Sequence, residues 1–189
     1  MLKMFPLSSD DKCALLNIAR QAISGAVSEQ RLPDCPQNPS IPGGTFVTLH
    51  RSGRLRGCVG QIGAAGSLED TVARAAIGAA LYDPRFPPVS QPEIAGLEIE
   101  ISVLSPPQPM ALEAIVLGRH GVIVVRNEQR GLLLPQVAAG RKWSAERLLE
   151  EACGKAGLSR DAWRDPSTQV LGFTAEVFSE RIYQEVSGI

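Results

Sequence analysis

A hairpin signal in the first third of the chain constrains the fold most. Residues 45–50 and 55–60 are apolar, β-prone segments, and Arg51-Ser52-Gly53-Arg54 lies between them. A short polar turn with glycine between two such segments predicts an antiparallel hairpin. The sequence therefore predicts a sheet that is mainly antiparallel.

The length of the turn decides which side chains share a face of this hairpin. With a two-residue turn at Ser52 and Gly53, residues pair one to one across the strands from the turn outward, and their side chains alternate between the two faces. On this register one face carries Val47, Leu49, Arg56 and Cys58, and the other carries Phe46, His50, Leu55 and Val59. His50 would then be unable to reach Cys58.

Helix and strand patterns follow one another in mixed order along the rest of the chain. Two S-x-x-D capping boxes, at Ser8 and Ser67, predict helix starts. The first predicts a helix over residues 10–28. The second predicts a helix of small, apolar residues that is buried on most sides. Prolines make residues 33–44 an extended loop. The remaining expectations are strands over 97–103, 122–125, 131–134 and 170–178 and a helix from Ser144 to Gly157. This order favours the α+β class, a mainly antiparallel sheet with flanking helices.

Composition limits the function classes. The 189 residues are 44% apolar and 21% charged, which predicts one medium domain or two small lobes sharing a core. The net charge of -1 disfavours a general nucleic-acid binder. The longest uncharged stretch, residues 35–50, holds three prolines, so it predicts neither a membrane span nor a signal peptide. We expect a cytoplasmic protein without membrane contact.

The cysteines predict neither a metal site nor a disulfide scaffold. Cys13, Cys35, Cys58 and Cys153 are widely spaced and form no C-x-x-C motif. No metal and no cofactor is therefore expected. Cys153 falls on the apolar face of a helix and is expected in the core, as is Cys13. Cys35 lies in the proline loop without an activating neighbour.

The segment Leu55-Arg56-Gly57-Cys58-Val59-Gly60 is the most unusual passage. Glycines in a strand are expected where the backbone kinks or closely approaches another group. Arg56 beside Cys58 would favour the thiolate, the form that attacks electrophiles. The alternative is a small buried cysteine between glycines that let a helix pack.

Other polar residues each allow a functional and a structural interpretation. His120 is the remaining histidine that could assist Cys58 as a base, or it is a turn histidine satisfied by backbone. Asp83 and Arg85 could bind a carboxylate or phosphate, or pair with each other. Glu98 and Glu100 are more simply the solvated face of a strand than an acid–base pair.

A glycine-rich stretch, Gly60-x-x-Gly63-x-x-Gly66, precedes the second helix. The N-terminus of a helix attracts anions. However, the spacing matches no phosphate-binding motif, and Asp70 would oppose an anion. The stretch therefore gives little support for a phosphate loop.

Six short blocks follow one another in a fixed order along the chain. They are L-R-G-C-V-G at 55–60, D-P-R-F-P-P at 83–88, I-S-V-L-S at 101–105, G-x-H-G at 118–121, L-P-Q-V at 134–137 and K-A-G-L at 155–158. Together they resemble the AMMECR domain family over residues 45–178. The resemblance implies a single domain over residues 1–189, built as a two-lobed, barrel-like antiparallel sheet. It also implies association with a Memo-like protein and a radical S-adenosylmethionine enzyme, and it marks the block at Cys58 as a suspected site.

Two hypotheses follow. In the first, the protein is an accessory module that binds a partner, a small anionic ligand or RNA through the strand at 55–60, the turn at 83–88 and nearby arginines. In the second, it is a thiol-dependent enzyme with Cys58 as nucleophile. The candidate catalytic residues are Cys58, Arg56 and His120, and the candidate ligand-binding residues are Arg56, Gly57, Gly60, Asp83, Arg85 and Phe86.

Overall fold

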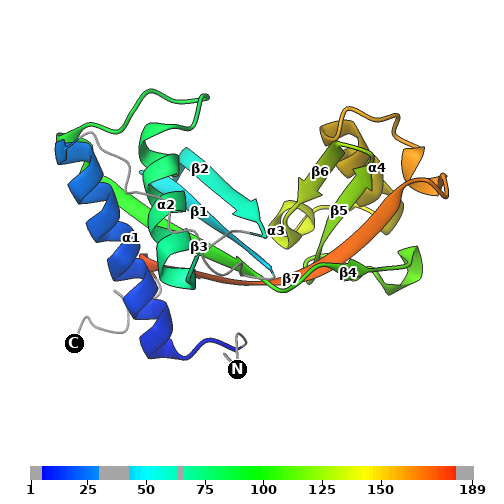
Figure 1. Cartoon of the computed structure of the whole chain (residues 1–189), viewed down its shortest axis with the longest axis horizontal. Coiled ribbons are helices and arrows are strands. Elements are labelled where there is room, and N and C mark those ends of the chain that lie inside the picture. Colours follow the sequence, from blue (N-terminus) through cyan, green and yellow to red (C-terminus); the bar gives the residue numbers. More distant parts are fainter. Residues whose placement is uncertain (1–5, 30–42, 64–65, 182–189) are drawn as a thin grey trace. The chain divides into compact units, whose positions relative to one another are not determined.

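The computed structural model describes residues 6–29, 43–63 and 66–181 (Figure 1). The chain divides into two compact units. Unit 1 comprises residues 1–104 and 176–189, and unit 2 comprises residues 105–175. Strand β7 (Gln169–Ser179) belongs to both, because the chain passes from unit 2 into unit 1 at Glu176.

Unit 1 is built on an antiparallel sheet with the strand order β2-β1-β3. Its elements in chain order are α1 (Ser9–Glu29), β1 (Gly44–Arg51), β2 (Arg54–Ile62), α2 (Leu68–Leu81), the 3-10 helix η1 (Gln91–Gly96) and β3 (Leu97–Leu104). The predicted hairpin is present, and Ser52 and Gly53 at its turn both have positive φ, as a tight hairpin turn requires.

Both predicted capping boxes are present. The Asp11 amide donates to Ser8 Oγ, and the Asp11 carboxylate accepts the Ser8 amide, each at 3.1 Å. Ser67 and Asp70 make the same reciprocal pair at the start of α2. These bonds satisfy amides that a helix start leaves without partners. The predicted helix over 10–28 is thus confirmed within one residue at each end.

The core of unit 1 lies between its two long helices and one face of its sheet. Helices α1 and α2 pack against each other, and α2 also packs on β1 and β2. Alternate residues of β1 and β3 point into this core. It includes Leu16, Ile23, Val47, Leu49, Val72, Ala76, Ile99 and Ile101.

Unit 2 contains a second hairpin and a helix that packs on it. Its elements are β4 (Gln108–Pro109), η2 (Leu112–Ala114), β5 (His120–Arg126), β6 (Gln129–Leu133), α3 (Pro135–Ala138), α4 (Ala145–Lys155), η3 (Ala162–Arg164) and the first part of β7. Strand β5 pairs with β6 and with β7. The core joins this sheet to α4 through Val122, Val124, Leu133, Leu148 and Leu149.

The α+β class with antiparallel pairing and flanking helices is confirmed. The short elements β4, η1, η2, η3 and α3 were not predicted. Residues 43 and 44 are the described part of the expected loop over 33–44, and Gly44 already begins β1, while Cys35 lies outside the described residues. None of the described helices is long and apolar enough to cross a bilayer.

Candidate functional site

The register of the first hairpin differs from the prediction. Thr48 pairs with Cys58 and Leu49 with Gly57, but His50 pairs with Leu55, so Arg56 is an extra residue at a β-bulge. A bulge shifts all later residues to the opposite face. The bulge is explained by the hydrophobic core. Val47 and Leu49 are buried in this core, and in the predicted register Arg56 would have pointed into it with them. Burying an unpaired arginine is unfavourable, and the bulge avoids it.

The bulge places Cys58 on the sheet face opposite the helices. Thr48 Oγ1 donates a hydrogen bond to Cys58 Sγ at 3.3 Å. On β3, Glu100 pairs with Thr48 and Glu98 with His50. We call these five residues the thiol face. The prediction that His50 and Cys58 occupy opposite faces was therefore wrong.

Glu100 is an unusual member of the thiol face because it is half-buried. Burial raises the pKa of its carboxyl, the electrostatic effect of the neighbouring His50 opposes this shift, and the nearby Glu98 carboxylate adds to it. Among the described residues no hydrogen bond is made to its carboxylate. Partial burial and a raised pKa beside a cysteine make Glu100 a candidate for the functional site, although its partial exposure also agrees with the predicted solvated face of the strand.

Asp83 and Arg85 hold the backbone of Cys58 from the outer edge of β2. Asp83 Oδ2 accepts the Cys58 amide at 2.8 Å, and Arg85 Nη2 donates to the Cys58 carbonyl at 3.4 Å. The same two side chains form an ion pair at 2.6 Å, with the Asp83 side chain 3% exposed. The hydrogen bond from Arg85 is the main reason that the pKa of Asp83 lies far below its usual range. We call this pair the edge clamp.

Arg56 lies in a different set of contacts. Its Nε donates to Glu93 Oε1 at 3.0 Å, and its Nη1 donates to the Pro87 carbonyl at 2.9 Å. A further bond reaches the Pro88 carbonyl, and the side chain is 13% exposed. The Arg56 side chain lowers the pKa of Glu93 to about 2. Arg56 thus ties β2 to the start of η1.

The glycines of the segment serve packing. A Cβ on Gly57 would lie 2.1 Å from the Ala79 carbonyl oxygen, so β2 and α2 touch through their backbones. A Cβ on Gly60 would lie 2.2 Å from the Thr45 carbonyl oxygen. Gly57 therefore has the structural role given as the alternative above, in which glycines allow a helix to pack.

The Phe86 side chain contacts the edge clamp. The guanidinium carbon of Arg85 lies 5.5 Å from the centre of the Phe86 ring.

His120 lies in unit 2, at the start of β5. Its Nδ1 accepts the backbone amide of Val116 at 3.1 Å. This bond assigns the proton of the neutral imidazole to Nε2. The histidine is thus bonded by backbone, as one of the two sequence interpretations expected.

The other described cysteines have structural positions. Cys153 is fully buried in the core of unit 2, and burial raises the pKa of its thiol. Cys13 is half-buried in α1. In the part of the chain that the structure describes, no three side chains of His, Cys, Asp or Glu are grouped as metal ligands.

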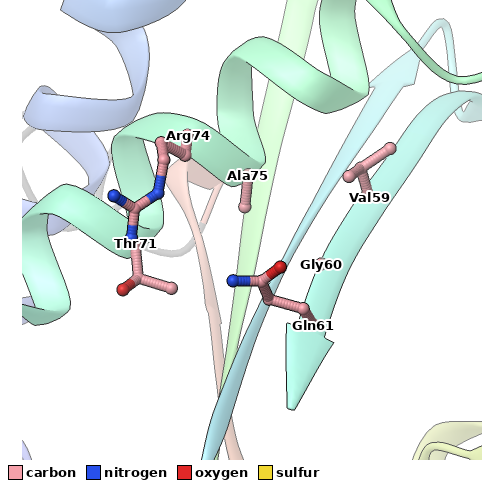
Figure 2. Close-up of a pocket in the computed structure, with 6 residues that line it drawn as sticks. All are labelled: Val59, Gly60, Gln61, Thr71, Arg74 and Ala75. Atoms are coloured by element: carbon pink, nitrogen blue, oxygen red, sulfur yellow. The ribbon is translucent and has the colours of Figure 1, made fainter. Parts of the chain in front are cut away.

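A small pocket of about 110 Å³ lies between the end of β2 and α2 (Figure 2). The Arg74 guanidinium and the Gln61 amide border it from opposite sides, and the Ala75 methyl group lies between them. The pocket lies on the helix-covered side of the sheet, since Gln61 has the same parity as Gly57 and Val59. It is therefore separate from the thiol face.

Sequence reasoning missed Thr48, His50, Glu93 and Glu100 as partners of the Leu55–Gly60 segment. One signal for the bulge was available in the sequence. Val47 and Leu49 of the first strand pair with Gly57 and Val59 of the second only if Arg56 is an additional, unpaired residue of the second strand. The Glu93 contact had no such signal, because it joins residues 37 positions apart.

The fold defines a two-unit α+β protein with an antiparallel sheet in each unit. On an edge strand of unit 1 it carries a cysteine whose backbone is held by the edge clamp.

The chain belongs to the AMMECR1 family, whose model matches residues 16–178. It is 44% identical over 190 residues to a protein of Methanothermobacter thermautotrophicus, covering 95% of this chain and 99% of the relative. A Methanosarcina barkeri protein is 37% identical, with 89% of each chain covered. The crystal structure of an uncharacterized protein from Pyrococcus horikoshii matches with a TM-score of 0.76 and 38% identity over 88% of this chain and 90% of that one. The predicted family resemblance is confirmed.

Proposed function

We propose that this protein is a binding accessory module that acts in the cytoplasm with a Memo-like protein and a radical S-adenosylmethionine enzyme. The observation that carries the proposal is how the charged residues near Cys58 are used. Arg56 bonds to Glu93, and Arg85 bonds to Asp83, so these side chains fix β2 in place. A surface that is rigid before binding loses less conformational entropy when a partner arrives.

Apolar side chains on this part of unit 1 support a protein partner. Leu55 and Ile62 on β2 are 42% and 36% exposed, and Tyr82, next to the edge clamp, is 51% exposed. Leu55 and Ile62 lie seven residues apart, toward the two ends of β2, so they offer separate apolar contacts along this strand rather than one patch.

The charges favour a protein partner over RNA. Of the arginines at positions 51, 54, 56 and 85, Arg51 and Arg56 share one carboxylate, that of Glu93, and Arg85 bonds to Asp83, so two carboxylates pair with three of these side chains. The thiol face adds the carboxyl groups of Glu98 and Glu100. This distribution offers little net attraction to a phosphate backbone.

The test is capture of the purified chain by the Memo-like protein and the radical S-adenosylmethionine enzyme of the same organism. We expect Leu55→Asp and Tyr82→Asp to weaken capture at least about tenfold, as expected for apolar contacts at an interface. Val116→Asp is the matched control, since Val116 is equally exposed but lies in unit 2. Equal capture of all variants, or no capture of the native chain, would reject the proposal.

A second candidate function is thiol chemistry at Cys58. The observation that favours it is the thiol face, where a hydroxyl bonds to Sγ and a histidine and a half-buried carboxyl occupy the same side of the sheet. Such groups can accept the proton of a thiol that attacks an electrophile. We expect His50→Gln and Glu100→Gln to slow alkylation of Cys58 by iodoacetamide severalfold, while labelling of Cys13 stays constant. An unchanged Cys58 rate in both variants would reject this candidate.

A further inference from the structure

The thiol face brings two carboxyl groups near Cys58. Thr48 of β1 pairs with Cys58 on one side and with Glu100 on the other, so Cys58 and Glu100 flank the same residue on one face of the sheet. Strands are about 4.8 Å apart, which separates the backbones of Cys58 and Glu100 by about 10 Å. Glu98 lies in the next row of this face, beside His50. At such separations a carboxylate attracts or repels a charged group that approaches the sulfur.

The charges of Glu98 and Glu100 are not used to hold the fold. Within residues 6–29, 43–63 and 66–181, no ion pair and no hydrogen bond is made to either carboxylate. Glu100 is half-buried, and burial raises the pKa of its carboxyl because it disfavours the charged form. A nearby positive charge reduces the cost of burying a carboxylate. The surroundings of Glu100 therefore favour the approach of a cation.

The arginines near Cys58 are already paired with other carboxylates. Arg85 Nη2 donates to the Cys58 carbonyl at 3.4 Å, and the Cys58 thiolate attracts the Arg85 guanidinium. The Asp83 carboxylate, however, lies 2.6 Å from the same guanidinium and offsets its charge. Arg56 bonds to Glu93 in the same way. The uncompensated charges near the thiol are thus the two carboxylates of β3.

We propose that Glu98 and Glu100 are specificity-determining residues, which make the Cys58 thiol select substrates that carry a positively charged group such as an ammonium or a guanidinium. This inference rests on the second candidate function, thiol chemistry at Cys58, and names its substrate class. A surface of one charge raises the local concentration of molecules of the opposite charge. A small anionic ligand, which the arginines suggested from the sequence, is the opposite expectation.

The probes are three methanethiosulfonate reagents: the positively charged ethyltrimethylammonium reagent, the negatively charged ethylsulfonate reagent and the neutral methyl reagent. The Cys58 thiolate attacks the sulfenyl sulfur of each, so that a disulfide bond forms, methanesulfinate leaves and the thiol proton passes to the buffer. Peptide mass spectrometry measures the rate at Cys58 at about pH 8, where imidazoles such as that of His50 are mostly neutral. Each rate is divided by the rate of the same reagent with 2-mercaptoethanol, which removes differences in intrinsic reactivity.

The native chain should prefer the positively charged reagent. At an ionic strength of about 0.01 M, we expect its normalised rate to exceed that of the negatively charged reagent at least about fivefold, as estimated for two charges about 10 Å from the sulfur. At about 1 M salt, where the Debye length is about 3 Å, most of this preference should disappear. A preference of unchanged size at high salt would overturn the proposal.

Variants assign the preference to the two carboxylates. We expect Glu98→Gln and Glu100→Gln each to reduce it at least about twofold, since each removes one of the two charges. Glu69→Gln is the matched control, because Glu69 is exposed on α2, which packs on the other face of the sheet. The thiolate fraction enters both rates equally, so their ratio is insensitive to changes in thiol acidity. Circular dichroism checks that each variant is folded.

The outcomes separate charge selection from thiol chemistry. Labelling of Cys58 by the neutral reagent with equal normalised rates for the charged reagents overturns charge selection and leaves thiol chemistry standing. A preference for the negatively charged reagent also overturns charge selection and assigns the effect to Arg85. An equal reduction by Glu69→Gln overturns the role of Glu98 and Glu100. No labelling of Cys58 by any of the three reagents overturns both charge selection and thiol chemistry.

Discussion

The two units use the same device to join a hairpin to a helix. In unit 1 a Cβ on Gly57 of β2 would lie 2.1 Å from the Ala79 carbonyl oxygen of α2. In unit 2 a Cβ on Gly131 of β6 would lie 2.0 Å from the Ala152 carbonyl oxygen of α4. In both cases the glycine lies on the second strand of a hairpin and permits direct backbone contact with a helix that comes later in the chain.

The residues after these two glycines differ in kind. Cys58 follows Gly57 and pairs with Thr48, while Leu132 follows Gly131 and pairs with the buried Ile123. The glycine is thus explained by helix packing in both units. What distinguishes unit 1 is the polar thiol face and the edge clamp, so a functional interpretation of the segment should rest on those features and not on its glycines.

The largest expected difference between the units is in thiol accessibility. Cys58 is half-buried at the sheet surface, whereas Cys153 is fully buried. We expect iodoacetamide to label Cys58 in the native protein at least about 100-fold faster than Cys153, whose labelling needs local unfolding. Peptide mass spectrometry measures both rates. Comparable rates would show that the thiol face is covered in solution.

The two strand glycines test whether the packing device is equivalent. We expect Gly57→Ala and Gly131→Ala each to destabilise the protein by about 2–3 kcal/mol, because a methyl group would overlap a helix carbonyl. Urea unfolding provides the measurement. Gly25→Ala and Gly154→Ala are helical controls with open space around the added methyl, and each should stabilise by about 0.5–1 kcal/mol. A neutral Gly57→Ala would contradict the backbone contact.

The Arg56–Glu93 pair predicts an acid sensitivity of unit 1. The folded pKa of Glu93, about 2, lies below the ordinary value of 4.5, so the folded state binds fewer protons in that range. The pair therefore stabilises above pH 4.5, and this contribution disappears as the pH falls from 4.5 to 2. We expect Glu93→Gln to cost about 1–2 kcal/mol at pH 7, allowing for partial solvent screening, and little near pH 2.

Unit 2 offers the matched control for this pH dependence. The Arg126–Asp165 pair is more exposed, at 32% and 42% for the two side chains. Asp165→Asn should change stability little at pH 7, because exposed pairs contribute little. A loss at pH 7 equal to that of Glu93→Gln would remove the distinction between the units.

Helix capping should give the smallest difference. Ser67 takes part in a reciprocal capping box on α2, whereas Ser144 accepts one amide, that of Arg147, on α4. We expect Ser67→Ala to cost about 1 kcal/mol and Ser144→Ala about 0.5 kcal/mol. Native-state hydrogen exchange of the two helices measures each effect. Ser67→Thr, which keeps the hydroxyl, should restore most of the loss.

Local sequence patterns were sufficient for most of the fold. Caps and apolar periodicity located α1, α2 and α4, and the Ser-Gly turn located the first hairpin correctly. The short elements escaped because η1, η2, η3 and α3 contain six residues or fewer, too few for a periodic signal.

The candidate site was less predictable because it depends on one extra residue in a strand. The bulge at Arg56 moves Cys58 to the other face of the sheet, and the β-strand propensities of the residues do not reveal such an insertion. Contacts between distant segments were equally hidden. Arg56 meets Glu93 rather than the thiol, and the Arg85 guanidinium, predicted as a possible anion ligand, meets Asp83. Charge alone could not assign these partners.

The edge clamp also makes the backbone of Cys58 behave unlike that of an ordinary edge residue. Amides that point outward from an edge strand normally exchange their hydrogen with water quickly, whereas the Cys58 amide is bonded to a carboxylate that is almost fully buried. Its deuterium uptake should therefore be as slow as that of core amides, while Gly60 and Ile62 exchange rapidly. A single amide signal thus reports whether the loop after α2 is docked, independently of any chemistry at the sulfur.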